Sequence, residues 1–162
     1  MEHTTDRIEI SPMNQDDLMD VFNLSNQDSV RANSFQTQRI PLDVHTEWFK
    51  KKLADPNTKM FKLLDNGKFA GQIRLGIENN QAVISISVDE KSQGKGFGSR
   101  LVDFAISFLR LDMPEIDYLL AYTKKENAAS IALFEKFNFK SIKNLKPEHD
   151  ELGFELSLKN ES

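Results

Sequence analysis

Residues 88–98 read Val88-Asp89-Glu90-Lys91-Ser92-Gln93-Gly94-Lys95-Gly96-Phe97-Gly98, and this stretch joins a predicted strand to a predicted helix. Apolar and polar side chains alternate before it, as in a strand, and apolar side chains recur at helical spacing after it. Glycines in such a turn can adopt positive φ and bring the backbone close to a ligand. The first N–H groups of the helix favour an anion, and Lys95 and Arg100 add positive charge. The stretch therefore predicts a phosphate-bearing ligand.

The glycine spacing separates this turn from two common phosphate-binding loops. A P-loop needs Gly-Lys-Ser/Thr at its end, whereas Gly96 is followed by Phe97-Gly98-Ser99. A dinucleotide-binding fold needs G-x-G-x-x-G and an acidic residue on a following strand, whereas this run is G-x-G-x-G without that partner. At this point, a glycine-rich β–α connection that binds nothing is the remaining alternative.

The pattern on both sides of the turn predicts a mixed α/β sheet flanked by helices, in the order β-α-α-β-β-β-α-β-α-β-β. Asn66-Gly67 is a strong hairpin signal. The expected strands are Arg7–Ser11, Lys59–Leu64, Phe69–Ile77, Gln81–Asp89, Asp117–Tyr122, Phe139–Ile142 and Gly153–Leu158. The expected helices follow a cap at Asn14, run from a cap at Asp43 to before Pro56, extend from the glycine turn to Leu111, and cover Asn127–Phe137, with polar, irregular segments at Ser25–Ile40 and Asn144–Asp150.

Composition predicts one domain over residues 1–162. Apolar residues make up 39% and charged residues 28%, which is a globular balance. The formal charge of −4 argues against nucleic acid as a general partner, and no apolar stretch is long enough for a membrane span. The absence of cysteine excludes thiol nucleophiles and cysteine-based metal sites, and it fits a cytoplasmic location. No histidine spacing typical of a metal site occurs.

Two segments resemble the signatures of the GCN5-related N-acetyltransferase (GNAT) family. Residues 88–98 resemble its acetyl-CoA signature, V-x-x-x-x-[QR]-x-x-G-x-[GA], and Asn127–Phe139 is similar to its second, Asn-led helix signature. Both occur in the family's order and separation. The resemblance implies the family's fold and acetyl-CoA as co-substrate, without a metal.

The resemblance also implies which residues bind acetyl-CoA. The backbone of Ile86, Ser87 and Val88 would pair with the pantetheine arm, and Asn127 would hydrogen-bond to it, unless Asn127 serves only as a helix N-cap. Ser130 lies one helical turn further. The pyrophosphate would be held by the amides of Gln93, Gly94, Lys95, Gly96, Phe97 and Gly98.

Proton transfer is where the chain departs from the family pattern. The position of the family's usual tyrosine proton donor is Phe134, which cannot donate. Tyr122, at the end of a strand, is the candidate donor, with a half-buried strand aromatic as the alternative. His45 and Glu78 are candidate bases, because histidine titrates near neutrality and Glu78 ends a strand. Serines of the Ile84–Val88 strand are a further option for relaying protons through water.

The N-terminal half suggests the acceptor. Residues 30–49 resemble V-R-x-x-S-F…I…H-x-x-W-F, a run found in acetyltransferases that act on UDP-linked amino sugars in pseudaminic acid biosynthesis. That resemblance implies substrate-binding roles for Arg31, Ser34, Phe35 and Trp48. The subfamily's W-R-N is replaced here by Leu24-Ser25-Asn26. The alternative for Trp48 is plain helix packing.

We therefore expect an acetyl-CoA-dependent N-acetyltransferase that transfers directly to a primary amine of a small molecule, first of all a nucleotide-linked amino sugar. A protein N-terminus, a lysine or a polyamine remains an alternative acceptor. A non-catalytic acyl-CoA-binding module is the alternative from another class. Either a monomer or a homodimer is compatible with the sequence.

Overall fold

The computed structural model of the protein describes residues 7–142 and 151–159, so the predicted polar segment Asn144–Asp150 lies outside the described residues. The strands are β1 Ile8–Pro12, β2 Thr58–Asp65, β3 Lys68–Glu78, β4 Gln81–Val88, β5 Tyr118–Lys124, β6 Lys140–Ile142 and β7 Glu151–Ser157. The helices are α1 Leu18–Ser25, α2 Asp28–Ala32, α3 Leu42–Ala54, α4 Phe97–Asp112 and α5 Ala128–Lys136, with 3₁₀ turns at Gln15–Asp17 and Glu90–Ser92. The predicted mixed α/β class is confirmed.

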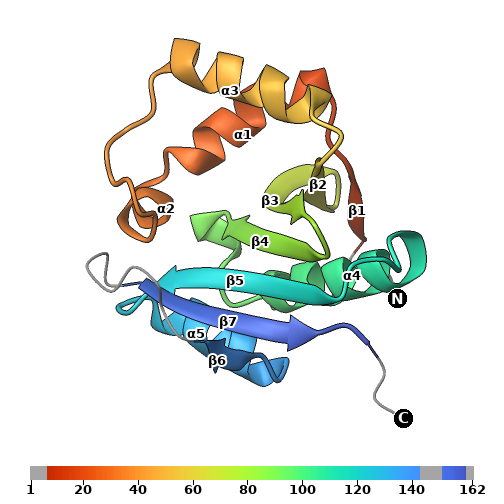
Figure 1. Ribbon diagram of the computed structural model, residues 1–162. Coiled ribbons are helices and arrows are strands. Elements are labelled where there is room, and N and C mark those ends of the chain that lie inside the picture. Colours follow the sequence, from red (N-terminus) through yellow and green to blue (C-terminus); the bar gives the residue numbers. More distant parts are fainter. Residues whose placement is uncertain (1–6, 143–150, 160–162) are drawn as a thin grey trace, which may run out of the picture.

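The strands form one sheet in the order β1-β2-β3-β4-β5-β7-β6. Only the central pair, β4 with β5, is parallel among the described strands, because α4 connects these two strands. In Figure 1, α1–α3 lie on one side of the sheet, and α4 and α5 lie on the other. None of the helices in the described part of the chain has the length and apolar character that crossing a membrane requires.

The hairpin between β2 and β3 has the predicted turn. Asn66 and Gly67 have φ values of 51° and 85°. Two consecutive residues with positive φ form the tight turn that matches the twist of paired strands, and asparagine and glycine tolerate it best. β2 and β3 therefore pair from Thr58↔Gly76 to Asp65↔Lys68.

Two local expectations in the N-terminal half are wrong. Asp43 does not cap α3, because the helix begins at Leu42 after an extended Pro41; Asp43 lies in the first turn, where a negative charge suits the helix dipole. The segment Ser25–Ile40 is not wholly irregular, since it contains α2. This short helix buries none of its residues, so it leaves no apolar periodicity to detect.

Two apolar clusters lie on opposite faces of the sheet. The larger one joins β2–β5 and β7 to α4 and α5, and it includes Leu63, Ile73, Leu101 and Leu109 with no exposed surface. The smaller one contains Met13, Val21, Phe49 and Met60, and it holds α1 and α3 on the other face. The sheet is therefore covered on both faces around β2–β4.

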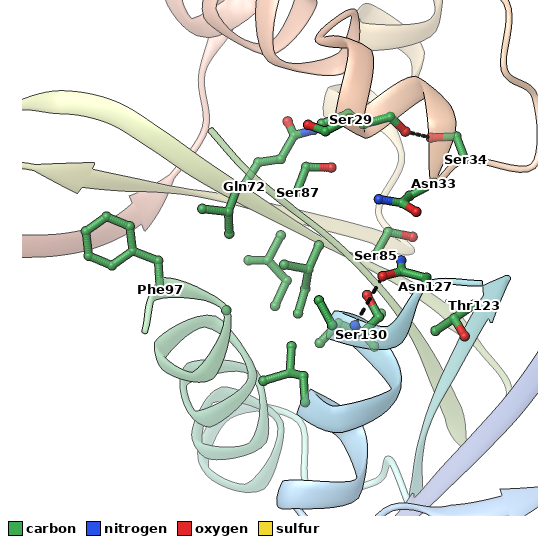
Figure 2. A pocket seen from close by; sticks show the side chains of 18 of the residues that line it. Ser29, Asn33, Ser34, Gln72, Ser85, Ser87, Phe97, Thr123, Asn127 and Ser130 are labelled. Carbon is green, nitrogen blue, oxygen red and sulfur yellow. Dashed lines mark hydrogen bonds between the residues drawn. The ribbon is translucent and has the colours of Figure 1, made fainter. Parts of the chain in front are cut away.

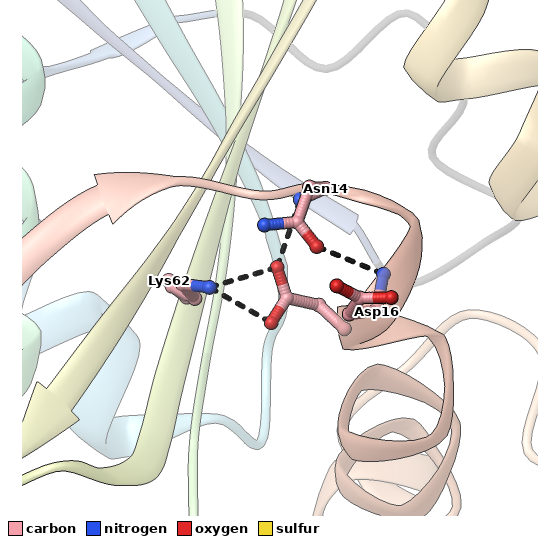
Figure 3. A network of polar contacts seen from close by, with 4 residues as sticks. Asn14, Asp16 and Lys62 are labelled. Atoms are coloured by element: carbon pink, nitrogen blue, oxygen red, sulfur yellow. Dashed lines mark hydrogen bonds and ion pairs between the residues drawn. The ribbon is translucent and has the colours of Figure 1, made fainter.

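A polar network fixes the start of α1 to the sheet (Figure 3). The predicted cap at Asn14 is confirmed, because its side chain accepts a hydrogen bond from the Asp16 N–H at 2.8 Å. Asp17 accepts the Asn14 N–H at 2.8 Å and forms an ion pair with Lys62 of β2 at 2.9 Å. Asp17 is only 6% exposed, so this pair is a buried contact between α1's entry and the sheet.

Candidate active site

The central strands separate over their second halves. The parallel register of β4 and β5 runs from Gln81↔Tyr118 to Ile84↔Ala121 and ends there. A cavity of about 700 Å³ lies where the two strands are apart. It is lined by Ser85–Val88 of β4 and by Tyr122 and Thr123 of β5. Its other lining residues come from both faces of the sheet: Ser29, Asn33 and Ser34 lie on one side of the strands in Figure 2, and Phe97 and Ser130 on the other.

The glycine turn presents its backbone to this cavity. Gly94 and Gly96 have φ values of 82° and 80°, and both line the cavity together with Gly98. A side chain added at Gly98 would approach Leu133 of α5 to 3.3 Å, so glycine lets the two helices meet closely. α4 begins without a side-chain cap and without an acidic residue in its first turn. Its first N–H groups and its dipole therefore favour an anionic ligand at this end.

Side chains of the same turn contribute less to the cavity. Lys95 is not among its lining residues, and its ammonium lies 3.4 Å from an Asp65 carboxylate oxygen. Gln93 lines the cavity, and its side-chain amide donates to the Val88 carbonyl at 3.1 Å, which ties the turn to the end of β4. Phe97 also lines the cavity and is otherwise buried, with 5% exposure.

The start of α5 forms the neighbouring wall. Asn127 is the N-cap of α5, and its side-chain oxygen accepts the Ser130 N–H at 3.2 Å. The capping bond uses the oxygen of this amide, so its NH₂ group is left for another partner. Asn127 and Ser130 both line the cavity, as does Phe134, which packs against Phe139 and Phe154.

On the opposite face, Arg31 of α2 mainly holds its own segment together. Its Nε donates to the Ser25 carbonyl at 2.7 Å, and Nη1 donates to the carbonyls of Gln36 and Gln38 at 2.9 and 3.3 Å. Nη2 donates to the Ser34 hydroxyl at 3.2 Å. Arg31 and Ser34 line the cavity, but most of the guanidinium donors are already used within residues 25–38.

Two aromatic side chains complete this wall. Phe35 lines the cavity and is 49% exposed. Trp48 of α3 also lines the cavity, and its ring lies 5.0 Å from the guanidinium carbon of Arg74 of β3. Trp48 thus contacts a charged group as well as packing within its helix.

Sequence reasoning missed Arg74 and Ser29. Arg74 lines the cavity between the buried neighbours Ile73 and Leu75, so strand alternation places it on the face of α1–α3. The lone charge within the apolar run of β3 was the available signal. Ser29 of α2 lines the cavity as well, and its buried hydroxyl has no hydrogen-bond partner.

His45 does not line the cavity. It is 2% exposed and lies among Phe22, Trp48 and Phe49, with ring centroids 5.3 to 5.8 Å away. Its Nε2 lies 3.2 Å from the Leu18 carbonyl oxygen of α1. Burial lowers the pKa of His45, and the bond to Leu18 opposes that shift. The arrangement joins α3 to α1 behind Trp48.

The two other predicted proton-transfer residues lie at different ends of the sheet. Glu78 ends β3 opposite Gln81, at the hairpin remote from the separated ends of β4 and β5, and it does not line the cavity. Tyr122 lines the cavity and is 39% exposed. Partial burial, and then the charges of Glu151 and Glu155, raise the pKa of Tyr122. Its phenol is therefore protonated at neutral pH.

Among residues 7–142 and 151–159, no group of three histidine, aspartate or glutamate side chains is placed so that it could hold a metal ion. The charged residues in the described lining are Arg31, Arg74 and Glu90. The Glu90 carboxylate already accepts the Ser29 N–H at 3.0 Å. The wall on the side of α1–α3 is therefore polar with an excess of positive charge.

A family model and solved protein structures both match this chain. The sequence matches the acetyltransferase (GNAT) domain over residues 7–140. Spermidine N-acetyltransferase from Vibrio cholerae, solved with CoA and spermine, superimposes with a TM-score of 0.83 at 20% identity, over 93% of this chain and 95% of that one. An N-acetyltransferase from Staphylococcus aureus Mu50 gives 0.79 at 24% identity, over 94% and 99% of the two chains. At these identities the likeness concerns the fold. No curated protein matches the sequence.

Proposed function

The chain belongs to the GNAT acetyltransferase domain family and is an acetyl-CoA-dependent N-acetyltransferase, and on this premise we propose that its acceptor is the primary amine of a nucleotide-linked amino sugar. The observation that carries the proposal is the cavity between β4 and β5, which reaches the glycine turn on one face of the sheet and α2 and α3 on the other. The co-substrate and the acceptor would enter from opposite faces and meet between the strands.

The residues on the side of α4 fit acetyl-CoA. Its pyrophosphate needs backbone donors without side chains in the way, and Gly94 and Gly96 supply an open turn in which an added Cβ would meet no atom within 4 Å. Its pantetheine arm needs a strand edge, and β4 has no strand partner on the β5 side after Ile84 among the described residues. Ile86, Ser87, Val88, Asn127 and Ser130 would hold that arm. Bound acetyl-CoA supplies the thioester.

The opposite wall suits a ligand rich in oxygen atoms. Ser29, Asn33, Ser85 and Ser87 present hydroxyl and amide groups to the cavity, and Ser85 and Ser87 point toward the α2 side in Figure 2. Sugar hydroxyls and phosphates can pair with such donors, whereas a polyamine needs carboxylates. Arg31, Ser34, Phe35 and Trp48 complete this proposed acceptor site.

In the proposed reaction the acceptor nitrogen, in its neutral form, bonds to the acetyl carbon. The carbon–sulfur bond breaks, and sulfur takes its electron pair. One proton leaves the nitrogen, and one reaches the sulfur. A backbone N–H near Val88 would stabilise the negative charge on the acetyl oxygen. No covalent bond to the protein is required, in keeping with a chain that has no cysteine.

We infer that Tyr122 donates the proton to sulfur, because it is the tyrosine in the described cavity wall and its raised pKa keeps it protonated. Water held by Ser85 or Ser87 would take the proton from nitrogen. His45 and Glu78 lie outside the lining, so their predicted roles as bases would need a relay through water or through movement of the chain. We retain these two roles as predictions.

The proposal is tested by following CoA release with a thiol reagent. The protein is incubated with acetyl-CoA and, separately, with a UDP-linked amino sugar, the matching free amino sugar, spermidine, a lysine peptide and a peptide with a free N-terminus. We expect the highest kcat/KM with the UDP-linked sugar. A higher kcat/KM with spermidine or either peptide would replace the sugar with that acceptor. Release with none of the amines, despite acetyl-CoA binding, would contradict a primary-amine acceptor altogether.

Three further expectations accompany this function. We propose that residues 1–162 act as one domain, since the cavity is lined by both the N-terminal helices and α5. We also propose a cytoplasmic location. A monomer or a homodimer is expected, and sedimentation of the purified protein distinguishes them.

A further inference from the structure

Arg74 is a cation that lacks a counter-ion in the described cavity wall. Its guanidinium carbon lies 5.0 Å from the centre of the Trp48 ring, a distance at which the ring face attracts the positive charge. Its one hydrogen bond in the described structure is a long one, from Nη2 to the Ser85 hydroxyl at 3.4 Å. No carboxylate of residues 7–142 or 151–159 pairs with it. Arg74 lines the cavity, so its remaining donors are available to a ligand bound there.

The position of Arg74 makes this incomplete pairing costly. The side chain is half-buried between α3 and the sheet, and burial lowers the pKa of Arg74. A guanidinium stays charged in proteins, so it cannot relieve the loss of hydration by releasing its proton. An anion from a ligand would supply both the charge and the acceptors that the side chain lacks.

The other charges that line the cavity do not supply that anion. Arg31 has the same sign, and its donors hold the α2 segment. Glu90 is bound by the Ser29 N–H and lies beyond the end of β4, whereas Arg74 is opposite Ser85 in the middle of the ladder. The unpartnered hydroxyl of Ser29 lies on the same side of the sheet and offers another donor (Figure 2).

We propose that Arg74, held over the ring of Trp48, is a specificity-determining residue that binds an anionic group of the acceptor, a phosphate or a carboxylate, while the acceptor's amine reaches the gap between β4 and β5. This inference rests on the proposed function and narrows it. It assigns the anion to Arg74 of β3 in place of Arg31, and it makes a polyamine a poor acceptor, because a second cation would meet the uncompensated charge.

Kinetics with matched acceptors provide the first test. Glucosamine, glucosamine 6-phosphate, UDP-glucosamine, 4-aminobutyrate and spermidine are compared for the wild type, Arg74→Gln and Arg74→Lys. In the wild type, the three anionic acceptors (glucosamine 6-phosphate, UDP-glucosamine and 4-aminobutyrate) should have a lower KM than glucosamine and spermidine. Arg74→Gln should raise that KM roughly 10- to 100-fold, the loss expected for a charge-assisted bidentate contact. It should leave the KM for glucosamine and for acetyl-CoA unchanged, and Arg74→Lys should lie in between.

Arg39→Gln is the matched control. Arg39 also lies over an aromatic ring, 6.0 Å from the centre of Phe22, but it is exposed and does not line the cavity. We expect wild-type kinetics from it. The kind of anion follows from which KM rises in Arg74→Gln. A rise for glucosamine 6-phosphate and UDP-glucosamine indicates a phosphate, and a rise for 4-aminobutyrate indicates a carboxylate. An equal rise in KM for glucosamine and glucosamine 6-phosphate in Arg74→Gln would overturn the inference, because that result indicates a structural role.

A binding measurement separates this inference from the proposed function. Trp48 is the single tryptophan of the chain, so its fluorescence reports directly on this contact. Titration with glucosamine 6-phosphate should change the emission of the wild type and of Arg39→Gln, but not of Arg74→Gln. An Arg74-dependent change without turnover of any amine would support the anion site and contradict the acceptor proposal. Turnover of an amine without any Arg74-dependent change in fluorescence would support the acceptor proposal and contradict the anion site.

Discussion

The cavity has two walls that offer a ligand different kinds of groups: backbone groups on the side of α4, and side chains on the side of α2 and α3, which we call the acceptor wall. Toward α4, the cavity meets a glycine turn, a helix N-terminus and the edge of β4, where backbone groups are the main donors. Toward α2 and α3, it meets side chains, among them Arg74, Trp48 and Ser29. Backbone donors persist when side chains are replaced. The comparison indicates that the wall toward α4 can keep one common co-substrate, while the wall toward α2 can be altered for different acceptors.

The two walls also differ in how they are attached to the sheet. α4 is fixed by fully buried Leu101, Ala105 and Leu109 in the larger apolar cluster. α2 buries no residue and is held by polar contacts: Gln27 just before it donates to Asp89 at 3.0 Å, and Lys124 of β5 donates to the Ala32 carbonyl at 3.0 Å. A wall held by polar contacts can open locally at lower cost than one held by apolar burial.

The largest effect should come from breaking the polar network that holds α1. This helix packs against α2 and α3, which form the acceptor wall. Asp17→Ala leaves the half-buried Lys62 without its partner, and we expect a loss of about 3–5 kcal/mol in the free energy of unfolding, as for other buried pairs broken on one side. Chemical denaturation measures it. Asp16→Ala is the control, because the exposed Asp16 contributes only its backbone N–H, and it should change stability by less than about 0.5 kcal/mol. Equal losses in the two variants would show that the ion pair contributes nothing.

A change in the glycine turn tests whether the other wall depends on the backbone. Gly94→Ala with Gly96→Ala forces two side chains into positive φ, at about 1–2 kcal/mol each, and should weaken acetyl-CoA binding roughly 30-fold or more. Calorimetric titration gives the affinity. Lys95→Ala lies between them, but its side chain contacts Asp65 outside the cavity, so we expect a change of less than about threefold. A larger loss of acetyl-CoA affinity in Lys95→Ala than in the double variant would show that a side chain, and not the backbone, holds the co-substrate at this turn.

Tyr122 lines the cavity just past the point where the pairing of β4 with β5 ends, and its removal should affect turnover more than binding. We expect Tyr122→Phe to lower kcat about 100-fold, the lower range for general acids, with the acetyl-CoA KM unchanged. Because burial raises the pKa of Tyr122, the wild-type rate should persist as pH rises and fall only above the ordinary tyrosine value of about 10. Tyr118→Phe, at the paired start of β5 and outside the cavity, is the control. An unchanged kcat in Tyr122→Phe would remove this residue from proton transfer.

The smallest effect concerns His45, behind the acceptor wall. Its lowered pKa means that the unfolded chain binds a proton more readily than the folded protein, so stability should fall as pH drops below about 6.5. The slope is at most about 1.4 kcal/mol per pH unit for one group. His45→Gln should remove this part of the pH dependence of Tm and change kcat little. A collapse of kcat with an unchanged Tm profile would instead favour the catalytic role predicted from the sequence.

Sequence reasoning predicted the elements well wherever local chemistry decides them. Asn66-Gly67 sets the hairpin, Asn14 and Asn127 cap their helices, and glycine takes positive φ at positions 94 and 96. It failed at α2, which is held by contacts with residues 60 or more positions away, such as Gln27 with Asp89 and Ser29 with Glu90. Such contacts leave no mark in the local pattern.

In the candidate site, too, the residues that act through local chemistry could be predicted, and those that depend on long-range packing could not. The glycine turn and Asn127 could be identified from the sequence because each acts through its own backbone position. Arg31 was assigned to the site by resemblance to a family motif, and His45 because histidine titrates near neutrality. Arg31 does line the cavity, where it binds carbonyls of its own segment, whereas His45 packs between aromatic rings outside the lining. Arg74 was not singled out from the sequence. Only the packing of α3 against β3 places it over Trp48.

By itself, the sequence determined the family, the order of the elements apart from α2, and the turn that suits an anionic co-substrate. These features depend on residues that are close together along the chain. Tertiary structure alone decided where β4 and β5 separate and which charged side chain faces the cavity from the side of α1–α3. The physical reason is that burial and charge compensation depend on every element packed around a side chain, and these elements come together only in the folded protein.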